Sequence, residues 1–141
     1  MILLVLRDES SGINRLPKNR EESTRIKTKR VYEEPEASDG YRVLVDRLWP
    51  RGVSKERAQV DLWFKDLAPS NELRQSFAHR PENFADFKER YFQELSGKSE
   101  LLGKLRDLER EKGTVTLLFS DRDTERNNAA VLKEYLEKQG G

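Results

Sequence analysis

The sequence predicts a single compact α/β domain in which a small, mostly parallel sheet is flanked by helices. Two short apolar runs, residues 42–48 and 114–119, are typical of buried strands, and the second is continuous, as in parallel sheets. Between and after them lie segments whose apolar residues recur three and four positions apart, which is the spacing of helices that cover a sheet. These features favour the layered architecture of Rossmann-like and flavodoxin-like proteins.

The first strand of the domain is predicted at residues 26–32, where β-branched and aromatic residues occur with three basic residues, as at a sheet edge. Asp39 and Gly40 then mark a turn before the strand at 42–48. A crossover between parallel neighbours usually takes a dozen or more residues, and this link is shorter. Strands 26–32 and 42–48 are therefore either antiparallel neighbours or not adjacent at all.

The middle of the chain begins with a kinked loop that contains Pro50 and Gly52, after which Ser54 can cap a short helix. Residues 60–67 fit a short strand and a helical turn equally well. Further helices are predicted at about residues 71–78 with Ser70 as the N-cap, 82–95, 99–112, and from a cap at Asp123 or Thr124 to about Lys138.

Residues 1–24 are predicted to be a flexible N-terminal extension of a domain at 25–141. For residues 2–6 the favoured interpretation is a poorly ordered apolar tip, and a strand added to a sheet edge or a dimer contact is the second. The opening apolar run is too short for a signal peptide. No stretch approaches the roughly 20 apolar residues that span a bilayer, so we expect no membrane association.

Composition narrows the classes of function. The 27 basic and 26 acidic residues nearly cancel, so the net charge gives no argument for bulk nucleic-acid binding. The absence of cysteine excludes disulfides, thiolate zinc sites and cysteine nucleophiles, and fits a cytoplasmic protein. With His79 as the single histidine, we expect no metal site. The sequence indicates neither a cofactor nor an oligomeric state.

Both apolar strands end in charged loops, residues 46–52 and 120–128. If the strands are parallel neighbours, these loops meet at the sheet edge where open α/β sheets bind ligands. The start of the final helix would add backbone N–H groups that favour an anion. The predicted ligand-binding residues are Arg47, Trp49, Arg51, Asn127 and Asn128, and the candidate acid/base residues are Asp123 and Asp46.

Each of these residues also has a simpler interpretation. Arg47 and Asp46 can pair with flanking helices, Trp49 can pack at a strand end, and Asp123 is first of all a helix cap. His79 is interpreted as a capping or loop histidine before it is considered as a general base. A rival hypothesis is a binding module for nucleic acid or protein, with a basic face made by Arg25, Lys27, Lys29, Arg30, Arg47 and Arg51 beside Tyr32 and Trp49.

Several motifs, RVLVDRLWPRG, KDLAPS followed by ELR, His-x-Pro at 79–81, ERYFQEL and TLLFSDRDTERNNAAVL, together resemble the DUF488 family in its YeaO-like branch, over about residues 25–137. The resemblance implies a compact α/β domain with an Asp-Arg pair and a later Pro-Arg pair after a strand. These positions match Asp46, Arg47, Pro50 and Arg51, and a second pattern matches Arg122 and Asp123 followed by Asn127 and Asn128.

Two positions depart from the branch. Arg80 stands where aspartate usually follows the histidine, and Arg126 stands where histidine is common. The resemblance implies a fold and a site but no activity. The resulting hypothesis is a pocket for an anionic, phosphorylated or nucleotide-like small molecule at loops 46–52 and 120–128. Whether it acts as an enzyme or as a binding module without catalysis is left open.

Overall fold

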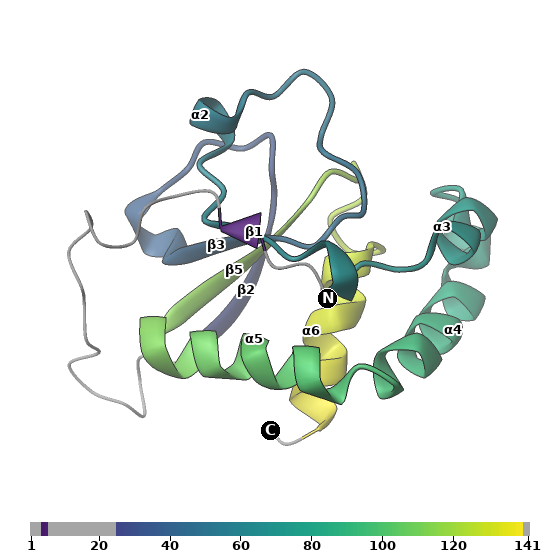
Figure 1. Cartoon of the computed structure of the whole chain (residues 1–141). Coiled ribbons are helices and arrows are strands. Elements are labelled where there is room, and N and C mark those ends of the chain that lie inside the picture. The colour runs from purple at the N-terminus through teal and green to yellow at the C-terminus, as the bar shows by residue number, and fades with distance from the viewer. Residues whose placement is uncertain (1–3, 6–24, 140–141) are drawn as a thin grey trace.

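A five-stranded sheet forms the frame of the computed structural model, which describes residues 4–5 and 25–139 (Figure 1). The strand order is β1-β4-β3-β5-β2, and only the β1–β4 pair is antiparallel. The strands are β1 (Leu4–Val5), β2 (Arg25–Arg30), β3 (Tyr41–Leu44), β4 (Leu62–Trp63) and β5 (Thr114–Phe119). The predicted α/β class with a mostly parallel sheet is confirmed.

The helices follow the predicted order closely. They are η2 (Ala37–Asp39), α2 (Lys55–Ala58), η3 (Lys65–Leu67), α3 (Asn71–Phe77), η4 (Pro81–Asn83), α4 (Phe84–Ser96), α5 (Ser99–Lys112) and α6 (Asn128–Lys138). The predicted caps of α2 and α3 are confirmed, since the hydroxyls of Ser54 and Ser70 accept backbone N–H groups of the first turn.

Strand β5 lies in the sheet between β2 and β3 and is parallel to both. The alternative in which β2 and β3 are not adjacent is therefore correct. Alternate residues of β5 serve opposite faces of the sheet: Leu117 and Phe119 join the large core, while Leu118 joins a smaller cluster. A continuous apolar sequence is what this two-sided burial requires.

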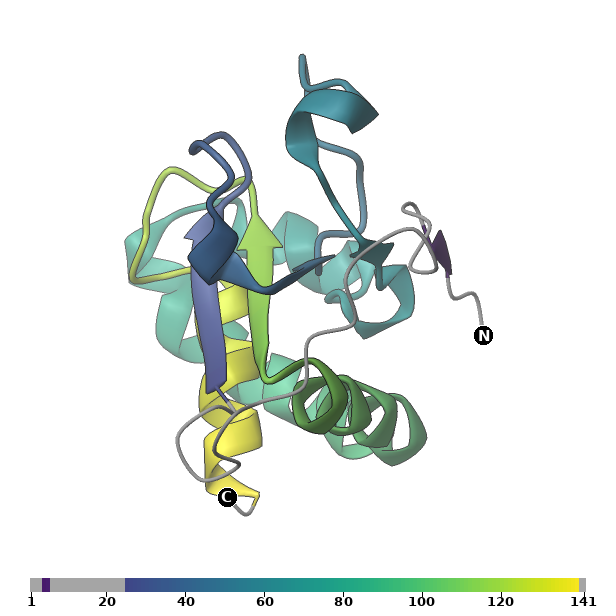
Figure 2. The ribbon, with the colours of Figure 1, turned by 90° about the vertical axis from the view of Figure 1, so that its left-hand side faces the viewer.

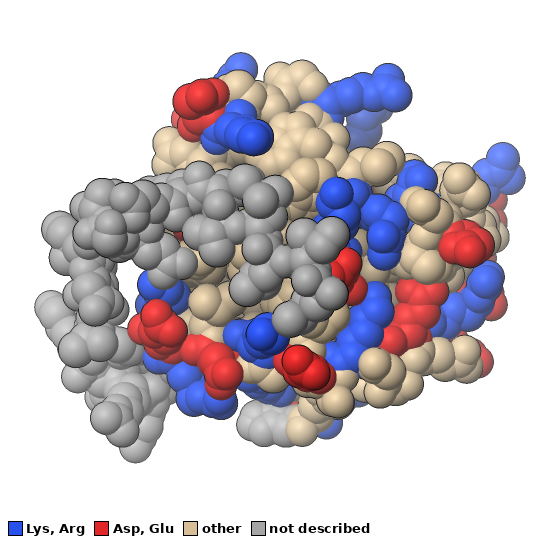
Figure 3. Space-filling view, in the orientation of Figure 1, with Lys and Arg blue, Asp and Glu red and all other residues tan. Residues whose placement is uncertain are grey.

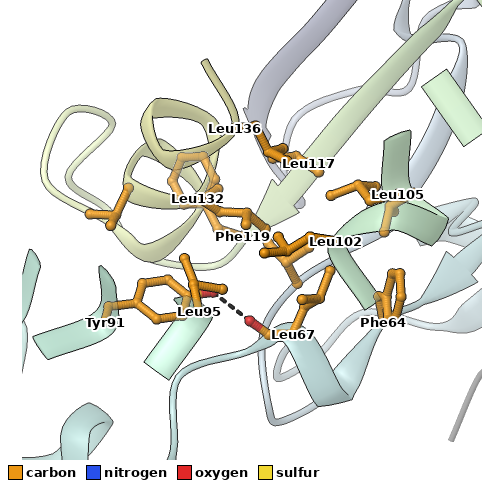
Figure 4. Packing of buried hydrophobic residues seen from close by; sticks show 14 of the residues in the cluster. Phe64, Leu67, Tyr91, Leu95, Leu102, Leu105, Leu117, Phe119, Leu132 and Leu136 are labelled. Atoms are coloured by element: carbon orange, nitrogen blue, oxygen red, sulfur yellow. Dashed lines mark hydrogen bonds between the residues drawn. The ribbon is translucent and has the colours of Figure 1, made fainter. Parts of the chain in front are cut away.

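The two faces of the sheet are covered unequally (Figure 2). Helices α3 to α6 contribute to the large core on one face, where leucine and aromatic side chains interdigitate (Figure 4). The other face carries a smaller cluster that includes Leu44, Val60 and Ala58 of α2. The loop between β3 and β4 thus serves as the second layer.

The strands predicted at 26–32 and 42–48 end earlier in the structure, at Arg30 and Leu44. Two alternatives that the sequence left open are decided, and one predicted helix start is wrong. Residues 60–67 contain both alternatives, since strand β4 is followed directly by helix η3. Helix α6 begins at Asn128, so the start predicted at Asp123 or Thr124 is wrong. Leu4–Val5 pairs with β4 at the sheet edge, which is the second interpretation of this segment. The flexibility predicted for the remainder of residues 1–24 lies outside the described residues.

A buried ionic network fixes the turn that leads into β3. Asp39 and Arg42 are 1% and 2% exposed, and their carboxylate oxygen and guanidinium nitrogen are 2.5 Å apart. Lys29 of β2 donates to the same carboxylate at 3.1 Å. Gly40, with φ of +66°, is required between them because a Cβ there would lie 2.4 Å from the carbonyl oxygen of Thr114.

Candidate functional site

The loops that follow β3 and β5 are joined directly by hydrogen bonds. The backbone N–H and hydroxyl of Ser120 donate to the Asp46 carboxylate at 3.0 and 2.7 Å. The side-chain amide of Asn128 donates to the same carboxylate and to the Val45 carbonyl, both at 2.9 Å. The parallel pairing of β3 and β5 therefore brings the two charged loops together, as the sequence predicted.

A cavity of about 300 Å³ opens where these loops meet helix α3 and the residues on either side of it. This volume lies at the lower end of the range for small-molecule sites. The charged and polar residues that line it are Asp46, Arg47, Arg51, Arg74, His79, Ser120, Asp121 and Asn128. Its apolar lining includes Leu48, Trp49, Pro50, Pro69, Phe77, Phe87 and the ring of Tyr32.

Two of the three arginines of the cavity come from the loop after β3. Arg47 is held against the wall because its guanidinium donates to the carbonyl of Pro69 at 2.9 Å and to that of Ala68 at 3.4 Å. Arg51 lies exposed at the rim, and its backbone carbonyl accepts a hydrogen bond from the Tyr32 hydroxyl at 3.0 Å. The backbone of residues 46–52, called the arginine loop below, is thus tied to Tyr32, which lies two residues beyond the end of β2.

The third arginine, Arg74, comes from helix α3. Its Nη2 donates to Asn71 at 3.3 Å, whereas its Nε is buried with no acceptor among the described residues. Buried donors in native proteins are normally paired, so such an atom beside a cavity calls for an explanation. No carboxylate in the described part of the chain forms an ion pair with any of the three cavity arginines.

A histidine–carboxylate pair stands at the edge of the cavity. His79 Nδ1 lies 2.8 Å from Asp121 Oδ2, and the other oxygen of Asp121 accepts the backbone N–H of Asp123. Ala78 and His79 follow helix α3 with φ angles of 51° and 55°, a left-handed conformation that residues other than glycine seldom adopt. The residue after His79 is Arg80, which has no carboxylate. The carboxylate beside His79 comes instead from Asp121, 42 positions along the chain.

The electrostatics of Asp46 follow from its position at the base of the cavity. Burial raises the pKa of Asp46, and the hydrogen bonds from Ser120 and Asn128 oppose this rise. The nearby charge of Asp121 raises the pKa further. The Asp46 carboxylate accepts three hydrogen bonds from the protein, which use most of its acceptor capacity. The Asp121 carboxylate has two such partners.

The structure separates the predicted site residues into two groups. Asp46, Arg47, Trp49, Arg51 and Asn128 line the cavity. Trp49 also packs edge-on against Trp63, with ring centroids 5.5 Å apart, and its indole N–H donates to the Val53 carbonyl. Trp49 is therefore a packing residue, as its simpler interpretation predicted, and it also lines the cavity.

Asp123 and Asn127 do not line the cavity. The Asp123 carboxylate accepts the backbone N–H groups of Arg126 and Glu125, and these bonds lower its pKa. Asn127 is fully buried and caps α6 by accepting the N–H of Ala130 at 2.8 Å. The functional roles suggested for both residues remain predictions, and their observed contacts hold the loop and the helix start.

Sequence reasoning did not assign Arg74 or Ser120 to the site. It expected Asp121 in the crevice opposite Arg47 and Arg51, and it considered Tyr32 only for the rival basic face. Arg74 lies on a short helix whose spacing gives no sign of a pocket, and its neighbours in the cavity come from distant segments. Asp121 and Ser120 did carry a signal, since they lie in the predicted strand-end loop. Their contacts with His79 and Asp46 depend on the tertiary arrangement, which no local pattern encodes.

No group of three or more acidic or histidine side chains that could hold a metal ion occurs within residues 4–5 and 25–139. None of the helices in that part of the chain has the length and apolar character needed to cross a membrane.

Comparison with known proteins places these features in context. A family model described as "Inactive DUF488-N3 subclade" matches residues 25–140. The uncharacterized protein YeaO of Escherichia coli K12 is 44% identical over 111 residues, which cover 79% of this chain and 96% of that protein. The uncharacterized protein Rv3073c of Mycobacterium tuberculosis is 45% identical over 113 residues, 80% of this chain and 94% of that protein. No solved structure matches the chain.

Proposed function

The chain belongs to the DUF488 family, and from this premise we propose that the cavity between its strand-end loops binds a small anionic molecule. The observation that carries the proposal is the convergence of Arg47, Arg51 and Arg74 on one cavity without an ion-pair partner among the described residues. Guanidinium groups match the oxygen atoms of phosphate and carboxylate groups in both charge and shape. A phosphorylated small molecule is the ligand class that this arrangement favours.

The proposed role is binding without catalysis. A general base needs a free acceptor beside the ligand, and the Asp46 carboxylate already accepts three hydrogen bonds from the protein. Asp123, the leading acid/base candidate from the sequence, lies outside the cavity lining. The description of the matching subclade as inactive supports the same conclusion.

The rival nucleic-acid hypothesis receives less support. Lys29 donates to Glu36 and Asp39, and Arg30 donates to the backbone carbonyls of Asp121 and Ser120. These cations of β2 are therefore engaged within the protein. On the face shown in Figure 3, acidic and basic side chains lie interspersed over much of the visible surface, whereas nucleic-acid binding favours one basic stripe.

Thermal unfolding in phosphate tests the proposal. Phosphate at 100 times its dissociation constant should stabilise the protein by about 2.7 kcal/mol, or roughly 10 °C in Tm. Phosphate also stabilises many proteins without binding a site, because it is excluded from their surfaces. The informative quantity is therefore the shift in Tm relative to chloride at equal ionic strength, compared between the wild type and an arginine variant.

Arg51→Ala is the test variant, because its exposed side chain can be removed with little cost to folding. Arg57→Ala is the matched control: it removes the same charge from the exposed surface of α2, outside this cavity. The phosphate-specific shift should fall in Arg51→Ala and persist in Arg57→Ala. Equal shifts in all three proteins would overturn the proposal.

A further inference from the structure

The rim of the cavity carries exposed apolar side chains. Among the described residues, the large hydrophobic side chains that are exposed are Tyr32, at 44%, and Leu48, at 57%. Both line the same cavity as the three arginines. An exposed apolar surface gathered at one opening is typical of a ligand-binding site, whereas isolated exposed apolar residues are normal.

The Tyr32 ring is held in place from two sides. Its hydroxyl donates to the Arg51 carbonyl at 3.0 Å, and the Arg30 guanidinium lies 5.0 Å from the ring centroid. A restrained aromatic ring can receive a second planar group at little entropic cost. The hydroxyl bond also links this ring to the backbone of the arginine loop, so that the apolar rim and the cationic wall form one unit.

The lining therefore offers two kinds of recognition side by side. Arg47, Arg51 and Arg74 favour a phosphate group, while the ring of Tyr32 and the side chain of Leu48 favour a planar apolar group. A cavity of about 300 Å³ suits a small ligand, since this is the lower end of the usual range. Inorganic phosphate or a simple sugar phosphate would leave the apolar rim uncovered.

We propose that the ligand is a nucleoside monophosphate, with its phosphate among the arginines and its base against Tyr32 and Leu48. This inference rests on the proposed anion-binding function and specifies the ligand for the same cavity. Base stacking on an aromatic side chain tolerates all four bases because each has a flat π face. The rim therefore selects for the presence of a base, and the arginines select for the phosphate.

Titration calorimetry with adenosine 5′-monophosphate, ribose 5-phosphate and inorganic phosphate tests the inference. The mononucleotide should bind the wild type tenfold or more tightly than ribose 5-phosphate, which is the increment expected from stacking one base. Tyr32→Ala should abolish this tenfold preference while ribose 5-phosphate still binds. Leu48→Ala should reduce the preference, and it leaves the arginine loop's bond to Tyr32 in place.

Tyr32→Phe is the control that separates stacking from loop positioning, because it keeps the ring and removes the hydroxyl bond to Arg51. It should retain the preference for the mononucleotide. If phosphate and ribose 5-phosphate bind but the mononucleotide binds no more tightly, the inference fails and the anion site stands. If none of the three ligands binds, the proposed function fails as well. A preference that survives Tyr32→Ala also contradicts the inference.

Discussion

The side chains of two consecutive asparagines, Asn127 and Asn128, make different hydrogen bonds. The Asn127 side chain accepts the N–H of Ala130 and donates to the carbonyl of Asp123, so it holds the start of α6. The Asn128 side chain donates to Val45 and Asp46 across the sheet edge. Both were predicted to bind ligand, and in the structure Asn128 alone of the two lines the cavity.

Substituting each asparagine with alanine should separate stability from binding. Asn127→Ala should lower the free energy of unfolding by about 1 kcal/mol, the usual cost of losing an N-cap. Its affinity for phosphate should stay near that of the wild type. Asn128→Ala should weaken phosphate binding, because the Asp46 carboxylate loses a donor that fixes it between the loops. Urea unfolding and phosphate titration measure the two effects, and an Asn127→Ala protein with normal stability would contradict the capping role.

The buried network of Asp39, Arg42 and Lys29 stabilises the turn before β3 and gives a prediction about pH. Burial raises the pKa of Asp39, but the Glu36 N–H, Lys29 and Arg42 together outweigh it and lower the net pKa below its usual 3.8. A lowered carboxyl pKa contributes stability above the unfolded value, and this contribution is lost as the pH falls through the folded value.

Asp39→Asn should therefore lower the free energy of unfolding at neutral pH by about 3 kcal/mol, because it leaves the Arg42 guanidinium buried without its anion. The difference from the wild type should hold down to about pH 4 and shrink as the pH falls further. Urea unfolding from pH 7 to pH 3 measures it. A difference that grows on acidification would show that Asp39 is not the stabilising anion.

Helix α4 supports the cavity through one buried hydroxyl. Tyr91 is fully buried and donates to the Leu67 carbonyl at 2.5 Å, just before the Ala68 and Pro69 carbonyls that hold Arg47 (Figure 4). Burial raises the pKa of the Tyr91 hydroxyl, so the group stays protonated and remains the donor. The segment that restrains Arg47 is thus itself fixed by the core.

Tyr91→Phe should lower the free energy of unfolding by about 1–2 kcal/mol, because the Leu67 carbonyl loses its buried donor. Phosphate affinity should also fall, through the loosened segment at Ala68 and Pro69. Tyr135→Phe is the control, since its hydroxyl contacts the exposed Gln139, and its effect should stay within about 0.5 kcal/mol. Chemical denaturation of both variants checks the prediction, and equal losses would argue against a special role for Tyr91.

At the scale of the whole molecule, the sequence predicted the fold because each element carried a local signal. The apolar run of β5 indicated burial on both faces, and the shortness of the link between β2 and β3 limited their pairing to two alternatives. The motifs at 42–52 and 116–132 identified the DUF488 family, which the comparisons confirm. The start of α6 was misplaced because Asp123 and Asn127 are both residue types that cap helices, and the helix uses Asn127.

The candidate site could be predicted only in part. Strand-end loops are a general position for ligands, so Arg47 and Arg51 could be proposed from topology alone. Arg74 and the His79–Asp121 pair could not, because they reach the cavity through packing between α3 and the β5–α6 loop. Such contacts depend on how distant segments pack together, and periodicity and capping rules describe only neighbouring residues.

The most direct test of the central claim is the location of a bound anion in crystals of the protein grown or soaked with phosphate. Phosphate should lie within hydrogen-bond distance of at least two of the guanidinium groups of Arg47, Arg51 and Arg74. Crystals of Arg51→Ala under the same conditions should show the site empty or weakly occupied. A cavity without phosphate in the wild type, at concentrations that saturate the Tm shift, would contradict an anion site at this position.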